Sequence, residues 1–141
     1  MSSLQLEIVT PERTVFSCEA NMVVAQTIDG QIGVLPGHIP LVTPLATGVM
    51  RVQVGPEQEQ KLAISGGFLE MSPDNKLTVL ARTAELAEEI DVDRAQQALA
   101  RAEERLNSKS ENIDMVRAET AMRRALTRLR AAGAEDQRHG Q

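Results

Sequence analysis

The sequence predicts a protein of two parts: an all-β domain, built as a sandwich or a barrel, and a C-terminal hairpin of two antiparallel helices. All six prolines and seven of the nine glycines precede Asp74, and neither residue type occurs between Asp74 and Ala132. Because Gly and Pro mark turns, the front half of the chain turns often and the back half runs as uninterrupted helix. Apolar residues also alternate in the front half but recur at spacings of three and four in the back half.

The front half contains short segments in which apolar and polar residues alternate. In Leu4–Ile8 and Met50–Val54 every second residue is apolar, which is the pattern of a strand with one buried face and one solvent-facing side. Turn-forming pairs such as Asp29–Gly30 and Gly55–Pro56 separate the segments, and many short strands at this spacing are typical of a sandwich or barrel. The other predicted strands are Thr14–Cys18, Met22–Thr27, Gln31–Leu35, Leu62–Ser65, Phe68–Met71 and Leu77–Arg82.

Two amphipathic helices are predicted in the back half. Asp91 is a good N-cap for the first helix, residues 107–112 interrupt the helical pattern, and Gly133 suits the position just after the second helix. Alanines in both apolar stripes let the helix axes approach closely but limit the buried area, so we expect a weakly held hairpin. The stripes consist of Val92, Ala95, Leu99, Ala102 and Leu106 in the first helix, and of Met115, Ala118, Met122, Ala125, Leu129 and Ala132 in the second.

These patterns divide the chain into three segments. Residues 1–84 are expected to form the β domain, residues 85–133 the helical hairpin, and the polar residues 134–141 a disordered tail. A chain of 141 residues has room for one full hydrophobic core, so the hairpin is expected to be a smaller appendage.

The composition excludes several classes of function. The net charge of −5 and the absence of Trp and Tyr argue against a nucleic-acid-binding protein, which needs basic surface and stacking platforms. The single cysteine, Cys18, can form no internal disulfide and fits a reducing compartment. The first residues do not form a signal peptide, and no apolar run reaches the roughly 20 residues of a membrane helix. We therefore expect any membrane association to occur through partner proteins.

The segment Gly30–Pro40 carries three glycines and two prolines, which define a fixed backbone shape. Gly33 within a strand suits a bulge or a close backbone approach, and the prolines restrict the chain around His38. A structural corner is one interpretation of these residues. A small hydrolase built on His38 is another, although no nucleophile or carboxylate stands out beside it, and Asp29 with His38 is too little for a metal site. No helix follows, so the glycines are not a dinucleotide-binding fingerprint.

Two trios of arginines have the same internal spacing. Each trio lies about 110° to one side of its apolar stripe, in the same rotational sense, so an antiparallel hairpin brings both onto one face. Carboxylates at Glu103 and Glu119 project near the other flank. A solvated, salt-bridged face is the common interpretation of such charges, but a basic face without its own counterions suits a polyanion. The trios are Arg94, Arg101 and Arg105, and Arg117, Arg124 and Arg128.

Over about residues 3–132 the sequence resembles the epsilon subunit of the F-type ATP synthase. The resemblance implies a sandwich of about ten strands followed by a two-helix domain. It also implies a place in the central rotor stalk, in contact with the gamma subunit and the ring of c subunits, with Gly30, Gly33 and His38 at a partner interface. The residues that carry it are Val9–Pro11, Gly30, Gly33, Leu35, Pro36, His38, Pro40, Leu41, Thr47–Arg51 and Gly66–Glu70.

The start of the first helix resembles the motif of those bacterial epsilon subunits that bind ATP. The motif covers Ile90–Ala95, and further arginines follow the motif arginine at 7, 30 and 34 residues, with an acidic residue six before the motif aspartate. The resemblance implies that ATP is a regulatory ligand, that the arginines hold its phosphates and that the segment from Glu85 to Asp91 meets the adenine. The ATP-binding residues that it implies are Glu85, Ile90, Asp91, Arg94, Ala95, Arg101, Arg124 and Arg128.

Together these features predict a non-catalytic rotor subunit of a proton-translocating ATP synthase, peripheral on the cytoplasmic face of the cell membrane. Its sandwich would couple ion-driven rotation to ATP synthesis. Its hairpin would inhibit ATP hydrolysis by extending against the alpha and beta subunits, and ATP would favour the folded hairpin. No catalytic residue, metal site or nucleic-acid partner is expected. The alternative is a stand-alone nucleotide-sensing protein with the same two parts.

Overall fold

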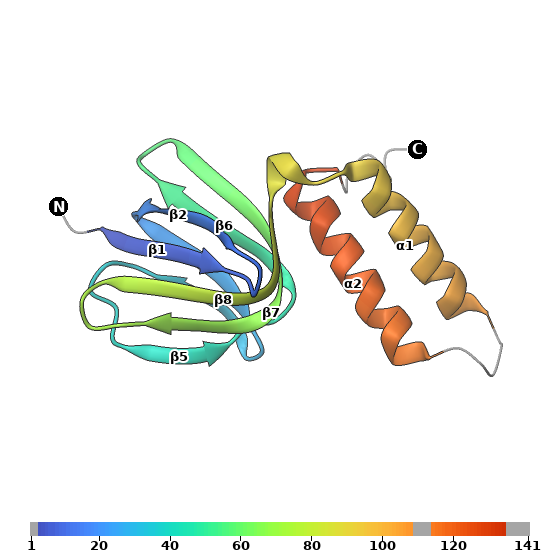
Figure 1. Cartoon of the computed structure of the whole chain (residues 1–141), viewed down its shortest axis with the longest axis horizontal. Coiled ribbons are helices and arrows are strands. Elements are labelled where there is room, and N and C mark those ends of the chain that lie inside the picture. Colours follow the sequence, from blue (N-terminus) through green and yellow to red (C-terminus); the bar gives the residue numbers. More distant parts are fainter. Residues whose placement is uncertain (1–2, 109–113, 135–141) are drawn as a thin grey trace.

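The computed structural model describes residues 3–108 and 114–134 and consists of a β-sandwich with a two-helix hairpin beside it (Figure 1). The predicted fold class is therefore confirmed. The strands in the described residues are β1 (Leu4–Val9), β2 (Thr14–Ala20), β3 (Met22–Thr27), β4 (Gly30–Val34), β5 (Leu41–Pro44), β6 (Gly48–Val54), β7 (Gln58–Met71) and β8 (Lys76–Leu86). A short 3-10 turn, η1 (Ala87–Glu89), links them to α1 (Val92–Asn107) and α2 (Met115–Ala131).

The strands follow one hydrogen-bonded path, in the order β2-β1-β8-β7-β6-β3-β4, and β5 pairs with β7 beside this path. All pairings are antiparallel except that of β1 with β8, which is parallel. The path folds into two layers, and the inward side chains of both layers meet in one core. Fully buried side chains of this core include Leu4, Leu6, Ile8, Val23, Met50, Val52, Leu62, Leu69, Met71, Leu77 and Val79.

Strand β7 passes from one layer to the other, which explains why eight strands are present in the described residues rather than about ten. Its first half pairs with β6, its last residues pair with β5, and β8 accompanies it from Leu62 to Met71. Gly66 and Gly67 lie at the bend, with φ of 67° and 110°. The segments Leu62–Ser65 and Phe68–Met71, which the glycines divide in the sequence, are therefore parts of a single strand.

The close approach of two backbones explains Gly67. A Cβ atom at this position would lie 1.9 Å from the carbonyl oxygen of Leu80 on β8. By contrast, Gly33 pairs with Val24 in regular register, and a Cβ there would meet nothing within 4 Å. The expectation of a bulge or close approach at Gly33 is therefore wrong for the isolated chain.

Both helices begin, and α2 also ends, with a local capping motif. Asp91 accepts a hydrogen bond from the Arg94 amide at 3.1 Å, and Asp114 accepts one from the Arg117 amide at 3.0 Å. Gly133 has a φ of 72° after α2, and the Gly133 and Ala134 amides bond to the Arg130 and Leu129 carbonyls, which is a Schellman cap. The predicted roles of Asp91 and Gly133 are thus confirmed, whereas the N-cap at Asp114 was not predicted.

The apolar stripes of the two helices face each other. The contact consists of Ala95, Leu99, Ala125 and Leu129, with Ala134 and several half-buried side chains around them. The predicted stripe fails at Met115, which is 45% exposed because it lies at the far end of the hairpin from the sandwich. Most of the predicted loop and tail, residues 109–113 and 135–141, lies outside the described residues.

Helix α2 packs against the sandwich, and α1 lies on its outer side (Figure 1). The apolar contact between the two parts is small: Ala63 on β7, Ile90 in the linker and Ala131 on α2, with Val49 and Ala132 half-buried beside them. Thr127, one turn before Ala131, is also buried, as a helix face turned toward the sandwich requires. Strand β8 runs to Leu86, two residues past the predicted division at residue 84.

Candidate functional site

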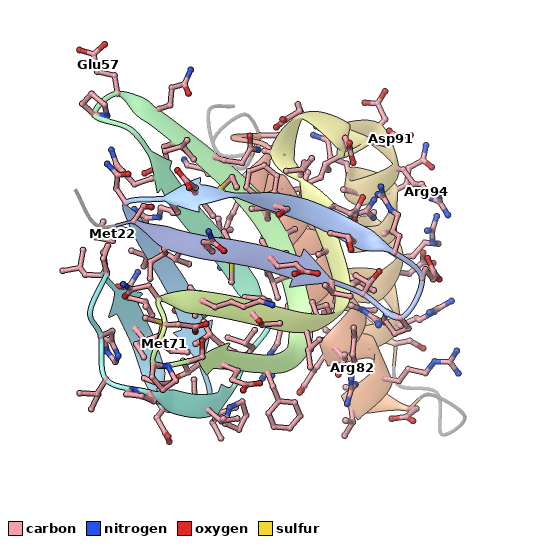
Figure 2. The ribbon with its side chains drawn as sticks, turned by 60° about the vertical axis from the view of Figure 1, so that its left-hand side comes forward. Met22, Glu57, Met71, Arg82, Asp91 and Arg94 are labelled. Carbon is pink, nitrogen blue, oxygen red and sulfur yellow. The ribbon has the colours of Figure 1, made fainter. Side chains whose placement is uncertain are left out.

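The predicted ligand residues around the start of α1 have different environments. Asp91 uses its carboxylate to cap the helix, Ala95 is fully buried between the helices, and Ile90 is buried against Ala63 and Ala131. Arg94 is exposed, and Figure 2 shows it close to Asp91 at the N-terminal end of α1. The side chains of Ile90 and Ala95 are thus packed inside the folded chain, whereas the Arg94 guanidinium is open to a ligand.

Glu85 and Arg128 form an ion pair between the sandwich and the hairpin. The Arg128 Nε atom lies 2.7 Å from Glu85 Oε1, and Arg128 Nη2 donates a hydrogen bond of 3.2 Å to Oε2. The Arg128 side chain is 23% exposed and the Glu85 side chain is 36% exposed. Because the pair is partly shielded from water, its attraction is stronger than that of a fully exposed pair.

This ion pair corrects the expectation that the basic face has no counterion of its own. Within the described residues, Arg124 makes no ion pair and is exposed. The counterion of Arg128 comes instead from the sandwich, 43 residues earlier in the chain. A pattern search along the helices alone could not have found it.

A cleft of about 260 Å³ lies where the hairpin meets the sandwich. On the sandwich side, the cleft is lined mostly by small and hydroxyl-bearing residues. On the hairpin side, it is lined mostly by alanines and two arginines. Glu85, Arg124 and Arg128 all lie at this cleft, so the structure brings three of the predicted site residues together. The other lining residues are Thr47, Ala63, Ile64, Ser65, Thr83, Ala98, Ala121, Ala125 and Thr127.

Arg101 does not line this cleft. It belongs to a separate shallow depression near the end of α1, together with Glu104, Arg105 and Ser108. It lies seven residues beyond Arg94, about 10.5 Å along the helix, so an extended ligand would be needed to reach both. The face can thus hold several anionic groups in a row, but the structure does not gather all its arginines at one point.

The chemistry of the cleft suits a ligand with an anionic end and a flat, largely apolar end. Exposed guanidinium groups bind phosphate or carboxylate oxygens, and they do so bidentately when geometry allows. The volume is a little below the roughly 300–1,000 Å³ of pockets that hold drug-sized molecules, so the cleft can take only part of a large ligand. Within the described residues there is no cluster of three or more His, Cys, Asp or Glu that could hold a metal ion.

The predicted partner-interface residues lie on and after β4. Leu35, Pro36, Gly37 and His38 form a turn in which the His38 amide bonds to the Leu35 carbonyl and Gly37 has a φ of 84°, as in a type II turn. The Gly37 amide donates to the Asn75 side chain at 2.6 Å, which ties the turn to the β7–β8 connection. His38 Nδ1 lies 2.8 Å from the Ile39 carbonyl. These contacts support the structural-corner interpretation of Pro36 and Gly37.

The sequence analysis missed an exposed apolar surface beside this turn. Pro44, Phe68 and Leu80 are paired across β5, β7 and β8, so they share the outer face of the sandwich. Phe68 and Leu80 are 53% and 51% exposed, although their neighbours Leu69 and Val79 are buried on the inner face. Val42, two residues before Pro44 on β5, shares this face and is 66% exposed, and other exposed apolar side chains of the sandwich domain are Ile28, Leu35 and Ile39. Outward-facing Phe and Leu in predicted strands were the available signal.

The fold and the cleft define a class of protein: a β-sandwich binding module with a helical hairpin whose basic face suits an anionic ligand. No helix in the described part of the chain is long and apolar enough to span a bilayer. Residues 3–87 match the family model of the ATP synthase delta/epsilon chain β-sandwich domain, and residues 88–133 match that of the long α-helix domain of the same chains.

Curated relatives match nearly the whole chain. The ATP synthase epsilon chain of Pelotomaculum thermopropionicum is 58% identical over 92% of this chain and 95% of its own length. That of Moorella thermoacetica is 53% identical over 95% of this chain and 99% of its own length. A chain in the cryo-EM structure of the Euglena gracilis mitochondrial ATP synthase, with OSCP, F1 and the c-ring, superposes with a TM-score of 0.80 at 25% identity, covering 94% of this chain and 82% of its own. The chain therefore belongs to the epsilon-chain family of bacterial F-type ATP synthases.

Proposed function

We propose that this chain is a non-catalytic subunit of the central stalk of an F-type ATP synthase, in which the sandwich joins the rotor and the hairpin regulates ATP hydrolysis. The observation that carries the proposal is the match of both parts, in order and over residues 3–133, to the two domains of the family. The chain would lie at the cytoplasmic face of the cell membrane, held there by the complex.

The exposed apolar surface around Phe68 and Leu80 supports a rotor role for the sandwich. Large apolar side chains grouped on one face of a folded domain mark a protein–protein contact. The gamma subunit and the c-ring are the partners that we propose for this side of the sandwich and for the adjoining turn at His38. Rotation would then pass through a rigid domain with one continuous core, which suits the transmission of torque.

The small contact between hairpin and sandwich supports a regulatory role for the hairpin. The apolar contact between the two parts is confined to a few residues around Ala63, Ile90 and Ala131, with the Glu85–Arg128 ion pair beside it, so little buried area is lost when the parts separate. We propose that the folded hairpin leaves the motor free. The released hairpin would extend along gamma and place its arginines against acidic surface of the alpha and beta subunits, which would inhibit hydrolysis.

ATP is the ligand that we propose for the basic face. Its phosphates would lie on Arg124 and Arg128, with Arg94 and Arg101 farther along the same face. Since α1 and α2 both contribute arginines, the ligand would join the helices and stabilise the folded form. A ligand at about 100 times its dissociation constant shifts such an equilibrium by about 2.7 kcal/mol, which is substantial for a hairpin held by so small a contact.

Deletion of the chain from Glu88 onward tests the regulatory part. Added to a complex depleted of this subunit, the full chain is expected to lower ATP hydrolysis, while the truncated chain restores coupling and leaves hydrolysis uninhibited. If the truncated chain inhibits as strongly as the full one, the hairpin is not the inhibitor. If neither chain binds the depleted complex, the stand-alone nucleotide sensor is favoured.

Replacement of Gly33 or His38 tests the rotor part. Because a Cβ atom at position 33 would meet nothing within 4 Å, Gly33→Leu is expected to fold normally and to weaken binding to purified gamma subunit. His38→Ala is expected to act in the same direction. Arg13→Ala, whose ion pair with Glu89 is long and exposed, is the control. Unchanged affinity for gamma in both variants would leave this turn as a structural corner only.

A further inference from the structure

Asn75, in the connection between β7 and β8, has an uncommon backbone conformation. Its φ is 62°, and every other positive φ in the described residues belongs to a glycine. Asn enters this left-handed region more readily than most residues, but only glycine does so at no steric cost. Since glycine would satisfy the backbone at position 75 better, the asparagine side chain is the feature that needs an explanation.

The Asn75 side chain holds the turn that follows β4. Its Oδ1 atom accepts a hydrogen bond of 2.6 Å from the Gly37 amide, 38 residues earlier in the chain. Within the described residues, no other hydrogen bond joins residues 35–40 to a different segment, and Pro36 and Pro40 have no N–H group that could form one. Between its covalent ends in β4 and β5, the turn is thus tied to the sandwich through this one hydrogen bond.

Asn75 is itself fixed by the sandwich. Its carbonyl accepts a hydrogen bond of 2.9 Å from the Gln5 amide on β1. The connection around it is closed by the Ser72 amide, which donates to the Lys76 carbonyl at 2.9 Å, and the Ser72 hydroxyl donates to the same carbonyl at 3.1 Å. The acceptor atom therefore has a defined position relative to β1, β7 and β8.

The hydrogen bond from Gly37 selects the conformation of the turn. A turn over Leu35–His38 can be of type I or type II, since proline suits the second position of both. The two types differ by about 150° in ψ of the second residue, so the peptide between Pro36 and Gly37 points its N–H in nearly opposite directions. With Asn75 as the acceptor of that N–H, the type II orientation, with a Gly37 φ of 84°, is the one stabilised.

The orientation of the turn matters to a partner because of the groups that it exposes. Leu35 is 55% exposed, and Ile39, directly after the turn, is 74% exposed. A flip of the central peptide exchanges the directions of the Pro36 carbonyl and the Gly37 N–H, and a released turn no longer holds the apolar side chains in one place. Both changes lower the fraction of molecules that can bind, and the apparent dissociation constant rises as that fraction falls.

We propose that Asn75 is a positioning residue for partner binding, which holds the turn after β4 in its type II form and acts through the turn rather than by touching the partner. This role rests on the proposed function, in which the turn contacts the gamma subunit and the c-ring. Asn75→Gly keeps the left-handed backbone accessible but removes the acceptor, so it is expected to weaken binding to a complex depleted of this subunit about threefold to tenfold. Asn75→Asp retains an acceptor oxygen and is expected to bind like the unaltered chain.

The affinity for the depleted complex is measured with the unaltered full chain, with both Asn75 variants and with His38→Ala. Asp74→Ala is the matched control, because Asp74 lies in the same connection and accepts a hydrogen bond from Ser72 but contributes none to the turn. It is expected to leave the affinity unchanged. Hydrogen exchange of the Gly37 amide is expected to be faster in Asn75→Gly and to stay slow in Asn75→Asp, and thermal melting verifies that each variant is folded.

The outcomes separate the positioning role from the proposed function. If His38→Ala weakens binding but Asn75→Gly does not, the positioning role is overturned and the turn remains a partner contact. Equal weakening by Asn75→Gly, Asn75→Asp and Asp74→Ala also overturns it, because the whole connection and not the acceptor then matters. If the chain binds but neither His38→Ala nor Asn75→Gly weakens binding, the turn is no interface and both ideas about it fail. If the unaltered chain does not bind the depleted complex, the proposed function fails, and Asn75 positions nothing for a partner.

Discussion

The sandwich and the hairpin each turn an apolar face inward, but they differ greatly in what they bury. Of the twelve largest fully buried side chains, ten lie in the sandwich and only Leu99 and Leu129 lie in the hairpin. The remaining inward positions of the hairpin are mostly alanines. Since hydrophobic stabilisation is about 25 cal/mol per Å² of apolar area, the sandwich carries most of the folding free energy.

Because of this difference, one short chain can combine a rigid sandwich with a hairpin that opens. The sandwich has one core that involves every strand, so no strand can leave without exposing it. The hairpin joins the sandwich through a small apolar cluster around Ala63, Ile90 and Ala131, with the Glu85–Arg128 ion pair beside it. Local opening is therefore expected at the hairpin at a free energy well below that of global unfolding.

The largest effects are expected from matched leucine-to-alanine substitutions in the two parts. Leu69 and Leu99 are 0% and 1% exposed, so each substitution removes the same fully buried group. Leu69→Ala is expected to lower the stability of the whole chain by about 2–5 kcal/mol. Leu99→Ala should instead create an early transition of helical signal and leave the melting of the sandwich nearly unchanged. Thermal melting followed by far-UV circular dichroism, at wavelengths that report helix and strand, checks this. A single shared transition in both variants would mean that the two parts do not unfold separately.

A second comparison concerns two glycines within the sandwich. Gly67→Ala is expected to destabilise the chain by about 2 kcal/mol or more, because the residue has a φ of 110° and its Cβ would meet the Leu80 carbonyl at 1.9 Å. Gly33→Ala should change stability by less than about 0.5 kcal/mol. Urea unfolding of the two variants measures the difference. An equal loss of stability in both variants would mean that the β7 and β8 backbones do not approach closely at Gly67.

A smaller effect is expected at the helix N-caps. Asp91→Ala and Asp114→Ala each remove one hydrogen bond to the backbone, at 3.1 and 3.0 Å, and are each expected to destabilise the hairpin by about 1 kcal/mol. Both should leave the sandwich unaffected. If Asp91→Ala weakens ATP binding more than Asp114→Ala at equal helicity, Asp91 acts on the ligand beyond its role as a cap.

The smallest effect concerns the linker between the two parts. A hydrogen bond from Gln60 to the Glu88 carboxylate, at 2.8 Å, lowers the pKa of Glu88 below its ordinary value. A lowered pKa in the folded state stabilises the folded linker above the ordinary pKa, and this contribution is lost as the pH falls through the lowered value. Gln60→Ala is expected to raise the pKa of Glu88 toward its ordinary value. An NMR titration of the Glu88 carboxyl carbon measures it, and Gln58→Ala should leave it unchanged.

Much of this arrangement could be predicted from the sequence because it depends on local rules. Asp91 and Gly133 occupy capping positions that neighbouring residues dictate. Strand β5 was missed because Pro40 precedes it and Pro44 is its last residue, and both suggest a turn. The continuity of β7 was hidden because Gly66 and Gly67 signal a break, although only a second backbone close by makes them necessary.

The candidate site could be predicted only in part, because it is assembled from distant segments. The helical spacing placed Arg124 and Arg128 on one face, and the motif resemblance drew attention to Glu85. The direct contact of Glu85 with Arg128 depends on how β8 and α2 pack, which no local pattern encodes. Likewise, the burial of Ile90 follows from Ala63 and Ala131, which come from both parts of the chain.

Hydrogen exchange of the full chain, with and without ATP, tests the central claim most directly. The claim is that a weakly held hairpin opens from a rigid sandwich and that ATP holds it closed. Without ATP, amides of α1 and α2 are expected to exchange much faster than those of β7 and β8. Saturating ATP should slow exchange in the helices about 100-fold and leave the sandwich unchanged. Equal protection of the two parts, or slowing by ATP throughout the chain, would contradict the account.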